Sequence, residues 1–439
     1  MTAIDVKYAA LGGPGGWLGA PTIAESVPPD GVGRYRHYAN GSIYWTSVTG
    51  AHEVHGLIRQ LWASRGWERS FLGYPLTDES VAPDGVGRYN HFQGGSVYWT
   101  PGTGAHEVHG AIRALWASKG WERSVVGYPT TDESVTPDGV GRYNHFQSGS
   151  IYWTPSTGAH EVHGAIRGLW SSIGWERSVL GYPLTDETTT PDGVGRYNHF
   201  QSGSIYWTPS TGAHEVHGAI RGLWASLGWE RSWLGYPISS ELTTPDGVGR
   251  YSLFQHGGIF WTPTGGAVAV RELVRVHAKV LTTPTVPIAT MVASMQQVYG
   301  TAGVGVILAS TETLNLPALN DCDVGGCTMG TTTGEQDLLF SNRNNVGTNE
   351  VVAYFVRSTV PPYNGCAAFP AGRPGAVVAQ GATTWTLGHE LGHVLGLPHV
   401  NDNNRLMTGN GTSNITNPPP DLVATEITTM NASTFTLRP

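Results

Sequence analysis

The sequence predicts a multidomain protein in which an N-terminal array of small α+β repeats, each made of short strands plus one helix, precedes a C-terminal α/β domain. The first observation is a hexapeptide, Asp-Gly-Val-Gly-Arg-Tyr, that returns with a strict period, at Asp30, Asp84, Asp138, Asp192 and Asp246. A fixed period of this size is typical of supersecondary units that stack on their neighbours. The second observation is that the last third lacks this repeat, and strand-like and helix-like segments follow one another there.

Length and charge limit the classes of protein. A chain of 439 residues is too long for one ordinary hydrophobic core. We expect a boundary after residue 265, which separates a repeat array (1–265) from a second domain (266–439). The net charge is −8 and no basic block is present, which argues against nucleic acid as a partner. No apolar run is long enough to span a membrane, and no classical signal peptide is visible at the start.

Each repeat reads as two short strands followed by a helix. In the first repeat we expect strands at Gly33–Tyr35 and Gly41–Thr46, then a helix over Ala51–Ser64 that Gly66 ends. The helix is predicted from the spacing of its apolar residues, Val54, Ile58, Leu61 and Trp62. Fifteen of the 16 tryptophans lie before residue 262, so indole rings supply much of the buried area of these small units.

A second element, Leu-Gly-x-Pro, recurs in step with the hexapeptide, at Leu18, Leu72, Val126, Leu180 and Leu234. In period and motif the five units resemble LGFP repeats, although Tyr or Ala stands where the name has Phe. The resemblance covers residues 5–265. It implies a wall-binding stalk that attaches to cell-wall polysaccharide or peptidoglycan, and hence an extracellular or cell-wall-associated protein.

Two features of the repeats carry polar side chains that could bind ligands. The sequence His-Glu-Val-His begins at His52, His106, His160 and His214. Its histidines are three residues apart without a third ligand nearby, so we favour a structural or surface-binding role over a metal site. The second feature is a row of arginines beside Tyr and Trp: Arg34, Arg88, Arg142, Arg196 and Arg250. These residues could grip sugars or wall carboxylates, or cap a neighbouring unit, and both readings stay open.

The last third predicts an α/β domain. We expect strands at Leu273–Leu281, Val304–Ala309, Glu350–Arg357 and Pro374–Gln380. We expect one helix that begins at Pro287 and two more over Thr383–Leu395 and Asp421–Asn431.

The helix predicted at Thr383–Leu395 contains a dense group of histidines. His389 and His393 are four residues apart, so their rings leave the helix on one face. Gly396 can adopt the positive φ that turns the chain back and brings His399 to the same place. Three histidines with one open position are the ligand set of a catalytic zinc, and Glu390 can reach a water held there.

The eleven residues from His389 to His399, followed by Arg405-Leu406-Met407-Thr408, resemble the zinc motif and Met-turn of the metzincin metallopeptidases. The resemblance implies Zn²⁺ as cofactor, Glu390 as general base and Met407 packed beneath the zinc ligands. It also implies that a strand before the zinc helix, here Ala376, Val377 and Val378, pairs with an extended peptide substrate. The subfamily stays open, because Val400 follows the third histidine and no tyrosine follows Met407 at the position that some subfamilies use.

The cysteines and polar loops leave the disulfide pairing and calcium binding undecided. Cys322, Cys327 and Cys366 allow at most one disulfide between two of the three, and the pairing stays open. Calcium could bind the polar loops at Asn320–Gly326 and Asn401–Asn404, but we favour solvated loops without an ion.

The sequence therefore predicts a zinc-dependent metalloendopeptidase that acts on an extended peptide or protein and is anchored to cell-wall polymer by its repeats. One alternative is a hydrolase of peptidoglycan cross-bridges, which would use the same metal and base. Another is a wall-binding structural protein with a vestigial peptidase domain, against which the complete set of His389, Glu390, His393 and His399 argues.

Overall fold

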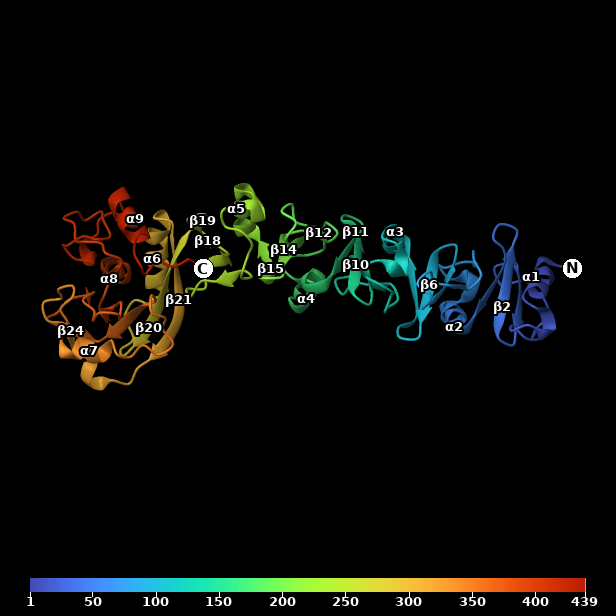
Figure 1. Ribbon diagram of the computed structural model, residues 1–439, viewed down its shortest axis with the longest axis horizontal. Coiled ribbons are helices and arrows are strands. Elements are labelled where there is room, and N and C mark those ends of the chain that lie inside the picture. Colours follow the sequence, from blue (N-terminus) through green and yellow to red (C-terminus); the bar gives the residue numbers. More distant parts are fainter. Residues whose placement is uncertain (439) are drawn as a thin grey trace. The chain divides into compact units, whose positions relative to one another are not determined.

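The computed structural model describes residues 1–438, and the chain divides into two compact units, Met1–Ala213 and His214–Pro439. Repeats of strands plus one helix come first, and an α/β region follows (Figure 1), so the predicted fold class is confirmed. Among residues 1–438, no helix combines the length and the apolar character needed to cross a lipid bilayer.

The first unit alternates small antiparallel sheets with single helices. Its helices are α1 (Ala3–Ala10), α2 (Gly56–Arg65), α3 (Gly110–Ser118) and α4 (Gly164–Ser172). The first two sheets consist of β1 (Arg34–Tyr38), β2 (Gly41–Thr46) and β3 (Gly50–His55), then β4 (Ser80–Val81), β5 (Arg88–His91), β6 (Gly95–Thr100) and β7 (Gly104–His109). The next strands are β8 (Ser134–Val135), β9 (Arg142–His145), β10 (Gly149–Thr154), β11 (Gly158–His163), β12 (Thr188–Thr189), β13 (Arg196–His199) and β14 (Gly203–Thr208). Strand β15 (Gly212–His217) lies at the division between the two units.

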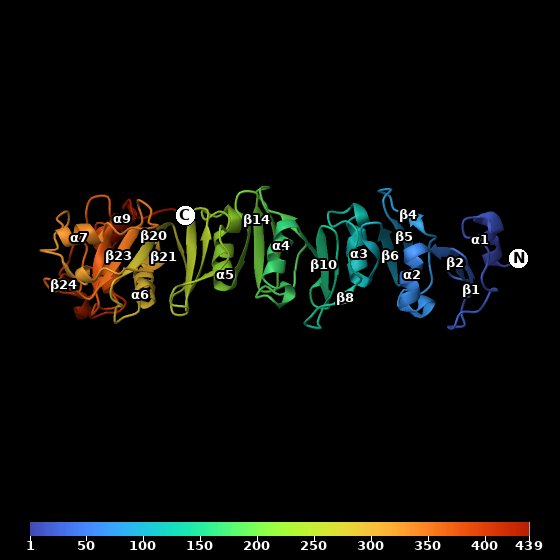
Figure 2. The same ribbon diagram turned by 90° about the horizontal axis from the view of Figure 1, so that it is seen from below.

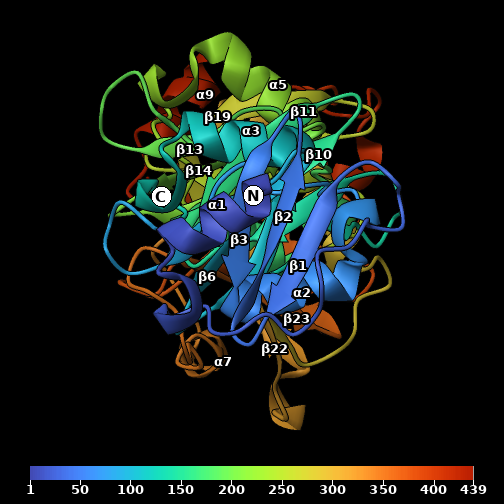
Figure 3. The ribbon, with the colours of Figure 1, turned by 90° about the vertical axis from the view of Figure 1, so that its right-hand side faces the viewer.

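Helices α2, α3 and α4 each pack between their own sheet and the next one. Helix α2 lies between the sheet that contains β2 and the sheet that contains β6 (Figure 2), and α1 lies across the sheet of β1, β2 and β3 (Figure 3). Trp62 of α2 is fully buried, with its ring centroid 4.6 Å from that of Tyr44 and 5.2 Å from that of Phe92 in the next sheet. A repeat therefore completes its core only with its neighbour, as the tandem period predicts.

The helix predicted at Ala51–Ser64 begins later than expected. Residues Gly50–His55 form β3, which pairs with β2 along its whole length, and α2 begins at Gly56. Val54, which contributed to the helical pattern, is fully buried from the strand instead. Cross-strand pairing therefore overrides local apolar spacing here, whereas Gly66 ends the helix with φ 104°, as predicted.

The His-Glu-Val-His segments join neighbouring repeats. Glu53 accepts a hydrogen bond from the Glu79 backbone N–H (3.0 Å) and lies 2.9 Å from the Nδ1 of His55. The Nε2 of the same ring lies 3.1 Å from the Glu79 carboxylate. His52 instead contacts Asp78 and the Thr49 carbonyl, so the two histidines do not face a shared metal.

The second unit starts near the end of the fourth repeat, with the last residues of β15 and with α5 (Gly218–Leu227). It continues through the fifth repeat, whose sheet leads directly into the α/β region. The fifth repeat holds β16 (Leu242–Thr243), β17 (Arg250–Phe254), β18 (Gly257–Thr262) and β19 (Gly266–Val270). In the earlier repeats a helix begins where β3 or its equivalent ends, but here the chain enters β20 (Glu272–Val280). Residues 266–270 complete the fifth sheet, so we propose to place the boundary of the array after Val270 rather than after residue 265.

In the earlier repeats a helix packs on the second face of the sheet. In the fifth repeat the α/β region packs there instead. Phe260 and Val270 form one cluster with Leu273 and Ile307. A Cβ at Gly305 would lie 2.6 Å from the Phe260 ring, so only glycine permits this close approach. The α/β region is thus fused to the fifth repeat through a shared core.

A five-stranded sheet organises the α/β region, in the order β21–β20–β23–β26–β25. Its other strands are β21 (Val304–Thr313), β23 (Val351–Val356), β25 (Gly365–Cys366) and β26 (Gly375–Ala379). The strands are parallel except β25, which runs antiparallel to β26 at the edge. Strands β22 (Asp321–Asp323) and β24 (Ser358–Val360) form a separate pair.

Helices cover both faces of this sheet. These helices are α6 (Ile288–Thr301), α7 (Gly334–Leu339), α8 (Thr386–Val394) and α9 (Ala424–Asn431). Residues of α6, α8 and α9 share a core with one face, and Leu339 of α7 belongs to the core on the other face. Single 3-10 turns occur at Gly13–Gly15, Trp67–Arg69, Trp121–Arg123, Trp175–Arg177, Trp229–Arg231, Pro317–Leu319 and Thr412–Asn414. The four strands and three helices that the sequence predicted are all present, whereas β22, α7, β24 and β25 were not predicted.

The contact of the fifth repeat with the α/β sheet generates a stability prediction. The substitution Phe260→Ala removes a ring that is 3% exposed, and we expect it to destabilise the second unit by about 3–5 kcal/mol. Hydrogen exchange of the β20 and β21 amides should speed up accordingly. Leu242→Ala, at a position that is 41% exposed in the same repeat, is the control and should change stability by less than about 0.5 kcal/mol. Equal effects of the two substitutions would contradict a shared core.

The junction of Glu53, His55 and Glu79 generates a pH prediction. Burial raises the pKa of Glu79 to about 7, and one of its oxygens has no partner. Burial lowers the pKa of His55, but the hydrogen bond to Glu53 and the negative charges of Glu53 and Glu79 together outweigh it, so the pKa is raised. Both groups bind protons more tightly in the folded chain, so their contribution to stability is lost as the pH rises through about 7. Urea unfolding at pH 5.5 and pH 8 should show a smaller loss of stability for Glu79→Gln than for the natural chain, and an identical loss would contradict the assignment.

Candidate active site

The three histidines of the sequence motif come from one helix and the turn that follows it. His389 and His393 lie one turn apart on α8, which is buried along most of its length. Gly396 adopts φ 99° and reverses the chain, and this reversal brings His399 back beside the helix. Tyr299 of α6 donates a hydrogen bond to the Gly388 carbonyl (2.8 Å) and so joins α8 to α6.

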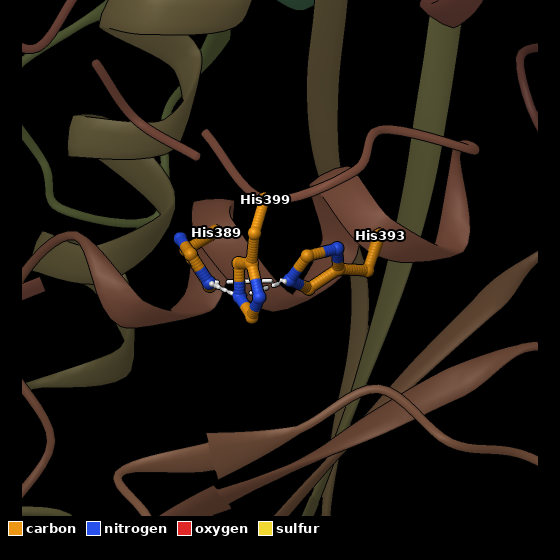
Figure 4. A group of neighbouring side chains, drawn as sticks. All are labelled: His389, His393 and His399. Atoms are coloured by element: carbon orange, nitrogen blue, oxygen red, sulfur yellow. Dashed lines mark hydrogen bonds between the residues drawn. The ribbon is translucent and has the colours of Figure 1, made fainter. Parts of the chain in front are cut away.

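The three imidazole rings converge on a single point (Figure 4). The Nε2 atom of His389 lies 3.2 Å from those of His393 and His399, and the last two are 2.9 Å apart. His389 donates its Nδ1–H to the Leu406 carbonyl, and His393 donates its Nδ1–H to the Leu397 carbonyl, both at 2.7 Å. Because a carbonyl only accepts hydrogen bonds, both rings carry their proton on Nδ1.

This proton arrangement fits a metal ion. Burial lowers the pKa of His389 to about 4 and also lowers the pKa of His393, so both rings are neutral at pH 7. Their Nε2 atoms then direct lone pairs at each other, which is favourable only if a cation lies between them. Ligand nitrogens around a tetrahedral zinc ion are about 3.3 Å apart, close to the separations found here. Within residues 1–438, these histidines form the one group of His, Cys, Asp or Glu side chains whose ligand atoms converge in this way.

The turn around Met407 packs against α8 and against the residue that follows His399. Met407 is fully buried, and a Cβ at Gly392 would lie 2.6 Å from its sulfur atom. The Met407 carbonyl accepts a hydrogen bond from the Val400 N–H (2.9 Å), which ties this turn to the residue after His399. Met407 therefore packs under the helix between the two histidines that α8 contributes.

Glu390 is almost fully buried beside the three rings. Burial raises the pKa of its carboxyl group to about 8 in the absence of a cation. Gly365 of β25 lies directly against it, because a Cβ at this glycine would meet the Glu390 side chain at 2.5–2.7 Å. Any side chain at position 365 would displace the carboxyl group. Sequence reasoning missed Gly365, since nothing local in the sequence relates it to the helix.

The site opens into a cavity of about 770 Å³. One wall is α8, from Thr386 to His393, and another is the edge segment from Pro362 to Ala367. Residues Gly326, Cys327 and Met329 form a further wall, and the segment from Thr408 to Thr412 completes the lining. The cavity thus joins the histidines and Glu390 to the edge of the sheet.

The strand expected to pair with substrate is not at the edge of the sheet. Strand β26, with Ala376, Val377 and Val378, is fully buried between β23 and β25. Val377 and Val378 pair with Cys366 and Gly365, so their main chain is unavailable to a peptide. The prediction is therefore wrong, because the short antiparallel strand β25 was not recognised in the sequence.

The cysteines take part in the wall of the cavity. Cys327 and Cys366 form a disulfide, and Cys322 is a buried thiol whose pKa burial raises to about 12. The disulfide connects the loop at 324–330 to β25, next to Gly365. It therefore ties two walls of the cavity to each other.

His277 lies outside this site. Its Nδ1 contacts the Ser310 hydroxyl at 2.7 Å, and its Nε2 contacts the Glu350 carboxylate at 2.8 Å. His277 is therefore a buried residue of the sheet with partners of its own. The calcium alternative for the two polar loops stays a prediction.

Comparison with known proteins gave a family match and distant structural similarities. No curated protein matches the chain. Metalloproteinase-II from Bacteroides fragilis is similar in structure with a TM-score of 0.29 and 13% identity, over 54% of this chain and 78% of its own. Archaemetzincin from Methanopyrus kandleri gives a TM-score of 0.27 and 15% identity, over 36% of this chain and 93% of its own. At these values neither structure carries an argument about function.

The family match covers the repeats. The segments that match the LGFP repeat are 18–70, 72–124, 126–178, 180–232 and 234–277. They begin at the Leu-Gly-x-Pro elements and their Val126 variant, and confirm the five units predicted from the period. Together these segments make up more than half of the chain, and the protein therefore belongs to the LGFP repeat family.

Proposed function

We propose that the protein is a zinc-dependent endopeptidase of the metzincin type, anchored to cell-wall polymer outside the cell by its LGFP repeats. The observation that carries the proposal is the convergence of three Nε2 atoms, two of them on rings whose Nδ1 protons are committed to backbone carbonyls. His389, His393 and His399 would hold the zinc ion. The ion would polarise the scissile carbonyl and lower the pKa of a bound water to about 7.

Glu390 moves the proton in this proposal. Its carboxylate accepts the proton of the attacking water and later delivers it to the leaving amine. Gly365 and the buried surroundings of α8 hold that carboxylate in one position. A positive charge at the three rings favours the ionised carboxylate, which offsets the cost of its burial.

Strand β25 is the segment that can pair with an extended peptide. The Ala379 N–H donates to the Asn364 carbonyl (2.9 Å), so these two residues form a hydrogen-bonded pair of the antiparallel ladder. The next pair, Gly365 and Val378, is then a non-hydrogen-bonded one. The N–H and C=O groups of Gly365 therefore point away from β26, towards the free edge. A peptide that pairs with this edge would pass beside Glu390.

The substrate is a peptide bond in a protein or in a peptidoglycan cross-bridge. The repeat family favours the second candidate, since a wall-bound enzyme would meet cross-bridges directly. Both reactions use the same metal and base. A structural protein with a vestigial peptidase domain is disfavoured, because the ligands and Glu390 are all in place.

Zinc binding tests the metal centre itself. We expect isothermal titration of the metal-free chain to give one tight zinc site. His393→Ala leaves two ligands and should weaken binding at least about 100-fold. His277→Ala is the control, because that ring belongs to a separate network, and its zinc affinity should be unchanged. Equal zinc affinity of the natural chain and His393→Ala would contradict the proposed ligand set.

Hydrolysis tests the role of Glu390. The purified chain should cleave either an unfolded protein or purified peptidoglycan, and Glu390→Gln should lower the rate at least about 1,000-fold while zinc stays bound. Gly365→Ala should also lower the rate with zinc retained, because a methyl group there displaces the carboxyl group. Gly381→Ala is a control, since a Cβ at that glycine meets nothing within 4 Å. Undiminished hydrolysis by Glu390→Gln would exclude this mechanism.

A further inference from the structure

The arginine row of the repeats belongs to a surface feature that recurs in every unit. Each arginine faces a tryptophan across an antiparallel pair of strands, and directly opposed residues lie on the same face of a sheet. The pairs are Arg34 with Trp45, Arg88 with Trp99, Arg142 with Trp153, Arg196 with Trp207 and Arg250 with Trp261. A valine precedes each arginine by two residues, and these valines are 54–68% exposed: Val32, Val86, Val140, Val194 and Val248.

In the first repeat these side chains line one cavity. Val32, Arg34, Trp45 and Glu25 line a space of about 430 Å³, together with residues 2–4 at the start of α1. The same four residue types stand at the matching positions of the other repeats, with Glu79, Glu133, Glu187 and Glu241 in place of Glu25. We call each set of Val, Arg, Trp and Glu a repeat groove.

The guanidinium groups of the grooves lie beside a buried glutamate but keep hydrogen-bond donors available for a ligand. In the second, third and fourth repeats the arginine side chain is 44–46% exposed. Its Nε atom lies 3.7–3.9 Å from a buried glutamate oxygen, which is beyond hydrogen-bonding distance. In the first and fifth repeats one terminal nitrogen donates to the backbone, from Arg34 to the Gly33 carbonyl and from Arg250 to the Gly249 carbonyl, both at 2.9 Å. Within residues 1–438 the terminal nitrogens of Arg88, Arg142 and Arg196 make no such bond, so they are available to a ligand. An exposed guanidinium edge of this kind is suited to a carboxylate.

The fifth repeat keeps the groove residues although it differs from the other repeats at buried positions. The fifth repeat has lost the polar residues that join the earlier repeats, with Ala269 and Arg271 where the first has Glu53 and His55. It has nevertheless kept Val248, Arg250 and Trp261. A position at the end of each helix also differs between copies, as Arg65, Lys119, Ile173 and Leu227 illustrate. The groove is thus retained where core and other surface positions have changed.

We propose that each repeat groove binds a carboxylate carried next to a sugar ring in a cell-wall polymer. The guanidinium pairs with the carboxylate, and the valine and the half-buried indole contact the apolar face of the sugar. This inference rests on the proposed wall anchoring and adds its binding site and ligand chemistry. One exposed ion pair is weak, so affinity comes from several repeats that engage one polymer at once.

Two sources could supply this chemistry: the peptide stems of peptidoglycan, or uronic acid units within a glycan. Co-sedimentation of the full chain distinguishes them. The probes are purified peptidoglycan, the same peptidoglycan with its carboxylates converted to methylamides, soluble polygalacturonate as a competitor, and neutral arabinogalactan. The chain carries Glu390→Gln throughout, so that any hydrolysis of the wall does not alter the probe.

The test variant combines Arg88→Gln, Arg142→Gln and Arg196→Gln. The matched control combines Arg69→Gln, Arg123→Gln and Arg177→Gln, which removes the same charge with the same period from exposed turns outside the grooves. We expect the groove variant to bind peptidoglycan at least about tenfold more weakly, and the control to bind within about twofold of the parent. Circular dichroism and thermal unfolding verify that both variants fold.

The outcomes are distinct. Loss of binding in the groove variant and on amidation of the carboxylates supports the inference and assigns the peptide stems. Competition by polygalacturonate at low concentration supports it and assigns uronic acid units. Equal weakening of both variants, or full binding to amidated peptidoglycan or to arabinogalactan, overturns the groove while leaving wall anchoring intact. A parent chain that binds none of the polymers overturns both.

Discussion

Two backbone carbonyls decide the chemistry of the α/β region. The carbonyls of Leu397 and Leu406 accept the Nδ1 protons of His393 and His389, which directs the free nitrogen of each ring to one point. Neither carbonyl belongs to α8. Both come from the chain that reverses at Gly396 and returns through Met407, whose sulfur lies against Gly392. The sheet, α6 and the Met407 turn together hold this reversal in place, so the proposed zinc site depends on the whole domain rather than on the helix alone.

The repeats and the α/β region are built by one rule of packing. A sheet of the array is stable only when both of its faces are covered, and within the first unit the helices provide that cover on either side. In the fifth repeat the α/β sheet takes the place of the following helix, through Phe260 and Leu273. The fifth repeat is therefore part of the core of the α/β region as well as the last member of the array.

The array separates its buried polar groups from its exposed ones. Glu53, His55 and their equivalents lie inside the junctions, where they link neighbouring repeats. The arginines and valines of the grooves face outwards. The arginines of the second to fourth repeats lie next to Glu79, Glu133 and Glu187, which His55 and its equivalents also contact. One set of carboxylates thus contacts the histidines inside the junctions and also lies beside the guanidinium groups at the surface.

The sequence alone determined the features that depend on local spacing. The period of the hexapeptide predicted five stacked units, and the positions of His389, His393, Gly396 and His399 predicted converging rings, because helix pitch and a glycine turn are local properties. Features that depend on pairing between distant segments were decided by the tertiary structure. These are the pairing of Cys327 with Cys366, and the edge strand β25 with Gly365 against Glu390. Each requires contacts between segments whose distance along the chain carries no periodic signal, so only the folded chain could reveal them.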